Sequence, residues 1–330
     1  LIMLLSDIWY YCNQYWIDIH DPRTTSYPIA SGGPGILITI LLSYLLFVKQ
    51  IGPKLMKNRQ PFELRWAMLI YNITMVLVNL FFFYHLVSRC EYGKRFLVFK
   101  FPPRNDFSPK VMSEIKLGFY CYLTRFMDLL DTVFFVLRKK YNQITFLHLY
   151  HHTLVPIMGW LCLKIAPQAP VIGLFLLFNT WIHSVMYLYY ALAAFGPGIR
   201  KYLWWKKYIT QMQLVQFAVC FCYGVVMVFV QEGFPPGLFW LGFAQNPFFF
   251  YMFYQFYKQT YKNEKRGNQQ RQIDFGCFIN DNKDQTDDQT DDQSNDQLND
   301  QENRSTNMES NETKSNGIKS ANGTNKVKCN

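Results

Sequence analysis

The residues most able to do chemistry are three histidines in the run His148-Leu149-Tyr150-His151-His152, half of the six histidines in the chain. On a helix, positions i, i+3 and i+4 share one face, so His148 is expected to stack with both His151 and His152. Clustered imidazoles can act as general bases, nucleophiles or metal ligands. The alternative is a hydrogen-bonded core cluster, which is more typical of a lone histidine than of three on one face.

A second polar face comes earlier in the chain. Arg125, Asp128, Asp131 and Thr132 are spaced i, i+3, i+6 and i+7, which predicts one face of a helix. If they are buried, these charges must be paired. One hypothesis is an ion-pair network that holds helices together. The other is that the two carboxylates hydrogen-bond imidazole N–H groups, fix their tautomer and raise their basicity.

Two further polar pairs occur downstream. Asn179 and His183 lie one helical turn apart and are followed one turn later by Tyr187, while Gln213 and Gln216 lie three residues apart. A histidine among aromatic residues is commonly a satisfied core residue, and glutamine is a frequent packing residue between helices. The alignment of Asn179 with His183 favours a functional interpretation of that pair.

The elements that must position these residues are predicted to be membrane-spanning helices. Half of the residues are apolar and only 17% are charged, against about a quarter in soluble domains. This composition argues against a soluble enzyme, a secreted disulfide scaffold and a nucleic-acid-binding protein. Crossing a bilayer takes about 20 apolar residues, and backbone groups must be satisfied within the segment, which favours helices. Seven apolar runs are found, of which the first is short, at about 34–48, 66–87, 117–137, 144–163, 171–195, 208–230 and 238–257.

The predicted fold is therefore an all-α, polytopic membrane bundle of seven transmembrane helices. The polar faces fall in the third, fourth, fifth and sixth runs. Polar groups inside a span are costly, so function is expected there. We divide the chain into a lumenal N-terminal segment (1–33), a seven-helix domain (34–257) and a cytosolic tail (258–330).

The orientation follows from basic residues that come after the odd-numbered runs and therefore belong on the cytosolic side. They are Lys49, Lys54, Lys57, Arg59 and Arg65, then Arg138, Lys139 and Lys140, then Arg200, Lys201, Lys206 and Lys207, and finally Lys258, Lys262, Lys265 and Arg266. The loop from Ser88 to Lys116 contradicts this pattern, with seven Lys or Arg on the opposite side. It is the longest loop, where the rule is weaker.

The tail is predicted to be disordered. Between Asp274 and Glu302 it carries ten acidic residues against one Lys and hardly an apolar side chain, so it cannot bury enough surface to offset its ordering entropy. Lys326 and Lys328 lie five and three residues from the end and match a dilysine signal for retrieval to the endoplasmic reticulum. This signal agrees with a cytosolic C-terminus.

Together these motifs resemble the ELO family of very-long-chain fatty acid elongases over residues 35–257. The resemblance rests on several motifs in the family order: Gly52-Pro53-Lys54, Asn58-Arg59-Gln60-Pro61-Phe62, the run from Asp131 to Lys140, the histidine run, residues 179–190 and residues 210–217. One motif departs from the family pattern. Lys-x-x-Glu-x-x-Asp-Thr is replaced by Arg125, Asp128, Asp131 and Thr132. Arginine and lysine differ in geometry, which puts the rate or the pairing partner in doubt.

The resemblance implies a very-long-chain 3-oxoacyl-CoA synthase of the endoplasmic reticulum membrane, which joins a long-chain acyl-CoA to malonyl-CoA with loss of CO2. In the family's proposed scheme a histidine carries the acyl group as an acyl-imidazole. By motif position His151 is the first choice for the nucleophile and His183 the second, while His148 and His152 orient or protonate. Asp128 and Asp131 would hold the histidines, and Gln213 and Gln216 would donate to a developing oxyanion.

The remaining implied contacts are with substrates and partners. Arg125, Asn179 and Tyr187 are expected to contact substrate, and Arg138, Lys139, Lys140, Lys206 and Lys207 to bind CoA phosphates, although the positive-inside rule alone also explains these cations. No resident cofactor or metal is expected. The expected partners are the bilayer and the other elongation-cycle enzymes, a 3-ketoacyl-CoA reductase, a dehydratase and an enoyl reductase. Homo-oligomerisation stays open, and no nucleic acid is expected.

Two other classes compete with this interpretation. Membrane di-iron oxidases also carry histidine boxes, but they need roughly eight histidine ligands, whereas His20 and His85 lie apart from the four candidates. A seven-span receptor or transporter would explain buried polar groups, but it gives no reason for three histidines beside two carboxylates.

Overall fold

The computed structural model describes residues 7–261, and the acidic segment and terminal lysines predicted from the sequence lie outside them. Within that range the backbone is helical, and its only extended pairing is an isolated bridge between Lys100 and Glu232. Each of the seven apolar runs coincides with helix. The helices are α3 (Gly35–Leu46), α4 (Gly52–Met56), α5 (Arg65–Arg89), α6 (Pro109–Met127), α7 (Leu129–Leu137), α8 (Phe146–Ile165), α9 (Pro170–Ala193), α10 (Lys206–Val230) and α11 (Pro236–Tyr261).

Among residues 7–261, four helical stretches are long and apolar enough to cross a membrane: Gly35–Met56, Arg65–Arg89, Pro170–Ala193 and Lys206–Val230. The first is longer than the run predicted from sequence, because α3 continues through the π-helix η3 (Phe47–Ile51) into α4. The chain is thus a helical protein with several apolar helices of membrane-spanning length. The crossing of α6–α7, α8 and α11 stays a prediction.

The third run differs from the single helix predicted for it. The helix begins at Pro109, well before the apolar residues start, and Asp128 interrupts it between α6 and α7. The polar face of that run is therefore divided between two helices. In α8, Pro156 lies inside the helix, one turn after His152. A proline at such a position removes one backbone hydrogen bond.

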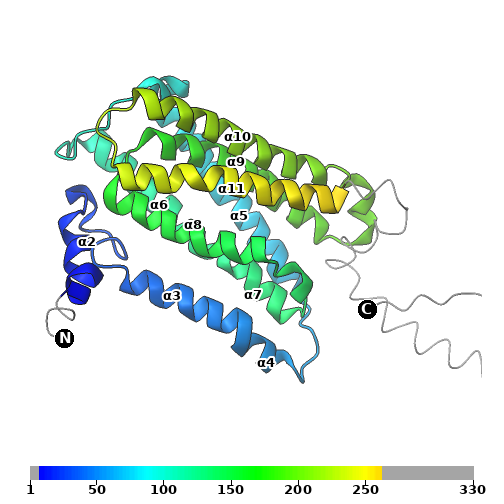
Figure 1. Ribbon diagram of the computed structural model, residues 1–330. Helices are drawn as coiled ribbons and strands as arrows, with labels where there is room; N and C mark the ends of the chain where they lie inside the picture. Colours follow the sequence, from blue (N-terminus) through cyan, green and yellow to red (C-terminus); the bar gives the residue numbers. More distant parts are fainter. Residues whose placement is uncertain (1–6, 262–330) are drawn as a thin grey trace, which may run out of the picture. The chain divides into compact units, whose positions relative to one another are not determined.

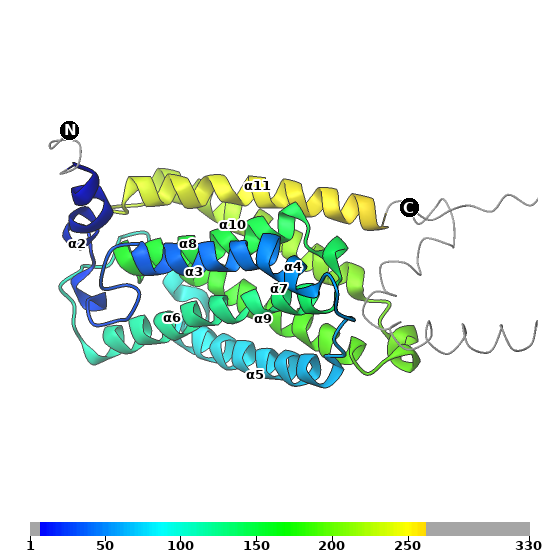
Figure 2. The same ribbon diagram turned by 90° about the horizontal axis from the view of Figure 1, so that it is seen from below.

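The long helices lie side by side with similar axis directions, and α3 lies at the edge of the group, beside α8 (Figure 1). The helices α5 and α6 are neighbours. They lie on one side of α7 and α9, and α11 lies on the other side (Figure 2). Gly52 allows the short helix α4 to approach α7 closely, because a Cβ at this position would lie 2.5 Å from Val136 Cγ1.

The segment before α3 packs onto the ends of α6 and α8 through buried polar contacts. Lys164, in the last turn of α8, is fully buried and donates to the carbonyl oxygens of Ala30 and Gly32, both at 2.8 Å. Asp21 and Arg23 form a buried ion pair at 2.7 Å. The short elements of this part are η1 (Tyr10–Gln14), α2 (Tyr15–Asp18) and η2 (Pro22–Thr24), and those of the later loops are η4 (Glu91–Leu97), η5 (Tyr141–Gln143) and η6 (Pro197–Tyr202).

Candidate active site

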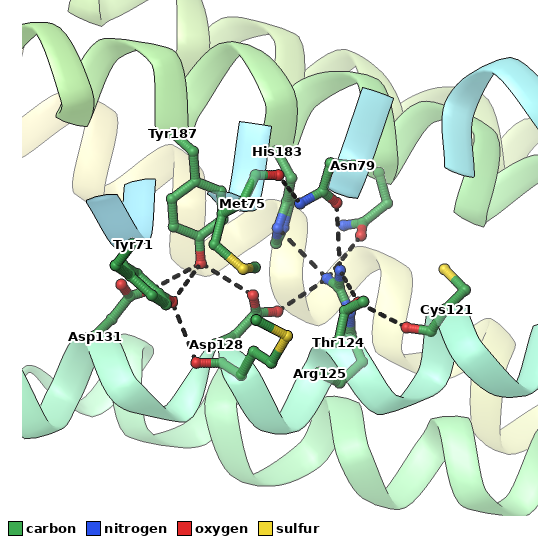
Figure 3. A network of polar contacts seen from close by, with 12 residues as sticks. Tyr71, Met75, Asn79, Cys121, Thr124, Arg125, Asp128, Asp131, His183 and Tyr187 are labelled. Carbon is green, nitrogen blue, oxygen red and sulfur yellow. Dashed lines mark hydrogen bonds and ion pairs between the residues drawn. The ribbon is translucent and has the colours of Figure 1, made fainter. Parts of the chain in front are cut away.

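The centre of the candidate site is the buried side chain of Arg125, near the end of α6 (Figure 3). Its Nη1 forms an ion pair with Asp128 at 3.0 Å and donates to Asn179 Oδ1 at 3.1 Å. The same nitrogen lies 3.4 Å from His183 Nδ1, which must accept because a guanidinium has only donors. The guanidinium also contacts Thr124 Oγ1. The predicted face around Arg125 thus joins α6 to the Asn179–His183 pair of α9.

Tyr187 binds both carboxylates. Its hydroxyl lies 2.9 Å from Asp128 Oδ1 and 2.8 Å from Asp131 Oδ2, and the side chain is fully buried. We expected Asp128 and Asp131 to hold the histidines. Among the residues that the structure describes, the polar contacts of these carboxylates are with tyrosines and Arg125 and none is with a histidine, which corrects that expectation. The physical reason is the direction of this face, which points at α9 and not at α8.

Two polar residues of α5 complete the network and were not singled out from the sequence. The Tyr71 hydroxyl donates to the Met127 carbonyl at 3.1 Å and lies 3.4 Å from the Tyr187 hydroxyl. Asn79 Oδ1 accepts from Arg125 at 3.4 Å. Both side chains are buried. Their polarity inside an otherwise apolar run of α5 was the signal that could have identified them.

The histidine cluster lies on the first turns of α8, as the spacing predicted. Thr145 caps this helix by accepting from the backbone N–H of His148. The rings of His148 and His152 are 4.2 Å apart and those of His151 and His152 are 5.3 Å apart. His148 Nε2 lies 2.7 Å from the Thr132 hydroxyl of α7. Thr132 thus holds the imidazole that the carboxylates were expected to hold.

An elongated apolar cavity begins beside both polar groups. Arg125 and Asn179 line it at one end together with Phe249, whose ring lies 5.8 Å from that of His151. From there it runs between α6, α8, α9, α10 and α11 towards Pro167 and Phe234. Its empty space is about 1400 Å³, including its opening. Buried Phe234 belongs to an apolar cluster with Leu238 and Phe239, which also line the cavity.

The two glutamines of α10 differ in their surroundings. Gln216 is buried, and its Nε2 donor has no hydrogen-bond partner among the described residues. It directly precedes Phe217, whose ring stacks on Phe249 at 5.5 Å. Gln213 is only half-buried. An unpaired buried amide is costly, so Gln216 is the better candidate for a donor to a bound molecule.

The basic residues predicted to bind phosphates do not form one uniform group. Arg138 is buried, and its guanidinium lies 3.4 Å from Met68 Sδ, so it faces the protein interior. Lys139 adopts a positive φ of 55° just after α7. Lys140, Lys206 and Lys207 are half-buried near the ends of α7 and α10.

Among the described residues, no group of three or more His, Cys, Asp or Glu is arranged to hold a metal ion.

The chain is similar to known proteins over most of its length. A model of the GNS1/SUR4 family, ELO, matches residues 30–269. Very long chain fatty acid elongase 7 of Drosophila melanogaster is 37% identical over 251 residues, which cover 73% of each chain. Very long chain fatty acid elongase 4 of Homo sapiens is 38% identical over 75% of this chain and 78% of its own length. Human very long chain fatty acid elongase 1 is 39% identical over 60% of this chain and 70% of its own.

Proposed function

Because this chain belongs to the ELO (GNS1/SUR4) family, we propose that it is a fatty acid elongase that catalyses the condensing step. A long-chain acyl-CoA and malonyl-CoA give a 3-ketoacyl-CoA two carbons longer, CO2 and free CoA. The observation that carries this proposal is the long apolar cavity beside the histidines, which suits a hydrocarbon chain whose reactive end lies at the polar network.

The dimensions of the cavity fit such a chain. From Phe249, beside the polar network, to Leu238, the cavity lining of α11 extends about 16 Å at 1.5 Å per residue. An extended hydrocarbon advances about 1.25 Å per carbon, from a C–C bond of about 1.5 Å and an angle near 111°. A tail of roughly 13 carbons therefore matches this length.

In the proposed mechanism His151 is the nucleophile. Its imidazole attacks the thioester carbon, the carbon–sulfur bond breaks, and CoA leaves as the thiol with one proton. Decarboxylation of malonyl-CoA then gives CO2 and an enolate, whose carbon attacks the acyl-imidazole. The carbon–nitrogen bond breaks, and the released His151 side chain takes up one proton to become neutral imidazole again. His148, fixed by Thr132, and the neighbouring His152 move protons. Gln216, with its unpaired donor, is the first choice for stabilising the oxyanion, and Gln213 is the second.

The Arg125 network has a positioning role in this scheme. Asp128 holds the guanidinium, and Tyr187 joins both carboxylates. Arg125 and Asn179 border the cavity, where they can contact the substrate near its thioester, and Arg125 also orients His183, the alternative acyl carrier. The shorter Asp128 in place of the family's glutamate suits the longer reach of arginine.

We also propose seven transmembrane helices, with the N-terminus lumenal and the C-terminus cytosolic in the endoplasmic reticulum membrane. The helix α8 has 20 residues and α11 has 26, lengths of about 30 and 39 Å at 1.5 Å per residue, and the hydrocarbon core is about 30 Å thick. Lys139, Lys140, Lys206 and Lys207 then lie at the cytosolic end, where they would meet the CoA phosphates.

The test uses microsomes that express the chain, labelled malonyl-CoA and acyl-CoAs from hexadecanoyl to tetracosanoyl. His151→Ala is expected to lose all labelled 3-ketoacyl product at matched expression. His85→Ala is the matched control, because His85 lies on α5 outside the candidate site. Product that survives in His151→Ala would keep the activity but reject this nucleophile. No product from the wild type across the panel would contradict the proposed activity.

A further inference from the structure

The seven basic residues between Ser88 and Lys116 are not explained by the predicted topology, and the structure accounts for three of them. Arg95 pairs with Glu114, and Lys110 with Glu91. Arg104 donates to the carbonyl oxygens of Ile19 and Ile165. The other four are Arg89, Lys94, Lys100 and Lys116. None of these four forms an ion pair with a carboxylate in the part of the chain that the structure describes.

Arg89 and Lys116 lie at one end of a groove between α5 and α6. Arg89 Nη1 donates to Ser113 Oγ at 2.7 Å, which ties its guanidinium to the start of α6 and leaves its other N–H groups for a ligand. Lys116 is exposed. Two cations side by side without a carboxylate partner favour an anionic ligand.

The walls of the groove are apolar and open to the outside of the helix group. They include Leu77 and Phe81 of α5 and Tyr120 of α6, which are 63%, 53% and 48% exposed. The floor includes Phe82 and Thr124, which are buried. In the membrane topology proposed above these walls face lipid tails, because α5 is long and apolar enough to cross a membrane. The groove therefore joins a cationic end to an apolar channel within the bilayer.

The length of the groove matches one leaflet. From Arg89 to Leu77 the helix rises about 18 Å, and from Lys116 to Met127 about 16 Å, at 1.5 Å per residue. Half of a hydrocarbon core is about 15 Å. A lipid tail in the groove thus extends from the headgroup region to about the bilayer midplane. Figure 2 shows α5 and α6 as neighbours, and residues of both helices line the groove.

We infer that the α5–α6 groove binds an anionic phospholipid, with its phosphate on Arg89 and Lys116 and one acyl chain between the two helices. The lipid belongs to the leaflet on the side of the 88–116 loop, which is lumenal in the orientation proposed above. An anionic phospholipid fits the groove better than a neutral hydrocarbon, because only its phosphate supplies a negative charge to the two cations. The bound tail also covers Thr124, whose hydroxyl accepts from Arg125 at 2.8 Å.

The experiment measures lipid binding by native mass spectrometry of the purified full chain. Phosphatidylglycerol and phosphatidylcholine with identical oleoyl chains are titrated separately. The wild type is expected to bind phosphatidylglycerol more tightly. Arg89→Gln/Lys116→Gln is expected to weaken that binding about tenfold or more, the scale of two basic residues near an anionic headgroup. Lys94→Gln/Lys100→Gln removes the same charge from the same loop outside the groove and is expected to bind like the wild type.

A second pair of variants tests the groove without altering charge. Leu117→Trp fills its wall, whereas Leu80→Trp adds the same side chain on α5 outside it. Only Leu117→Trp is expected to weaken phosphatidylglycerol binding. Equal affinity of the wild type for both lipids, or equal loss in the groove and control variants, would overturn the inference. A homodimer that dissociates only in Leu117→Trp would assign the groove to a second copy of the chain and also reject it.

Discussion

Replacing Gly118 by phenylalanine is expected to shorten the acyl chain that the protein accepts. Gly118 of α6 lines the cavity, and a Cβ added there meets no other heavy atom within 4 Å. A large side chain at this position enters empty space instead of a neighbouring helix. Because glycine is among the poorest helix formers, the substitution is also expected to leave α6 folded.

The size of the effect follows from helix geometry. The cavity lining of α11 extends from Phe249 to Leu238, about 16 Å along the helix, or about 13 carbons at 1.25 Å each. Gly118 lies seven residues before Arg125, about 10 Å along α6, or about 8 carbons. A side chain that closes the cavity at Gly118 therefore removes room for about 4 to 6 carbons.

The assay measures labelled 3-ketoacyl products in microsomes over acyl-CoAs from dodecanoyl to tetracosanoyl. Gly118→Phe is expected to move the longest accepted substrate down by about 4 to 6 carbons while keeping activity on the shortest. The control is Gly237→Phe, since a Cβ at Gly237 also meets nothing within 4 Å but that residue does not line the cavity. An active Gly118→Phe enzyme with the wild-type chain-length profile would refute the path of the acyl chain argued above.

Three further predictions concern stability. Tyr187→Phe removes a donor from two buried carboxylates, so the purified protein is expected to lose about 2–3 kcal/mol and about 5–10 °C in Tm; an unchanged Tm would contradict the network. Lys164→Met removes the hydrogen bonds to Ala30 and Gly32 and is expected to speed proteolysis within residues 7–33. The control Lys110→Met breaks only an exposed ion pair and is not expected to change the rate. Equal rates in the two variants would contradict the anchoring role of Lys164. Burial, followed by the charge of Lys164, lowers the pKa of His20. Its neutral form is therefore favoured in the folded state, and stability is expected to fall as the pH drops below about 6.5. Thermal unfolding between pH 7 and 5 should show this fall, and His20→Gln should reduce it.

Which residues share one face of a helix could be predicted from the sequence. The i, i+3, i+4 spacing of His148, His151 and His152 gave their shared face, because the helix repeat alone determines it. The Arg125–Asp128 pair followed from the same repeat. The apolar runs located the helices because length and hydropathy are local properties.

Contacts between helices could not be predicted in this way. Nothing in the spacing of Asp128 and Asp131 indicates that their partner is Tyr187 of α9, because the rotation of a helix is set by packing against its neighbours. Thr132 was grouped with the carboxylates, yet it binds His148. The burial of Lys164 depends on a loop more than 130 residues earlier in the chain, which no local pattern reveals.

Pro156 gives α8 a mechanical property that its other residues do not. Without an N–H, it leaves the carbonyl of His152 without its usual helical donor, and a helix bends most readily at such a point. The histidines lie before this joint, and Leu163, which lines the cavity, lies after it. The two halves of α8 can therefore tilt separately. In the proposed reaction, such a tilt would let the histidines adjust to each thioester in turn without moving the wall around the hydrocarbon tail.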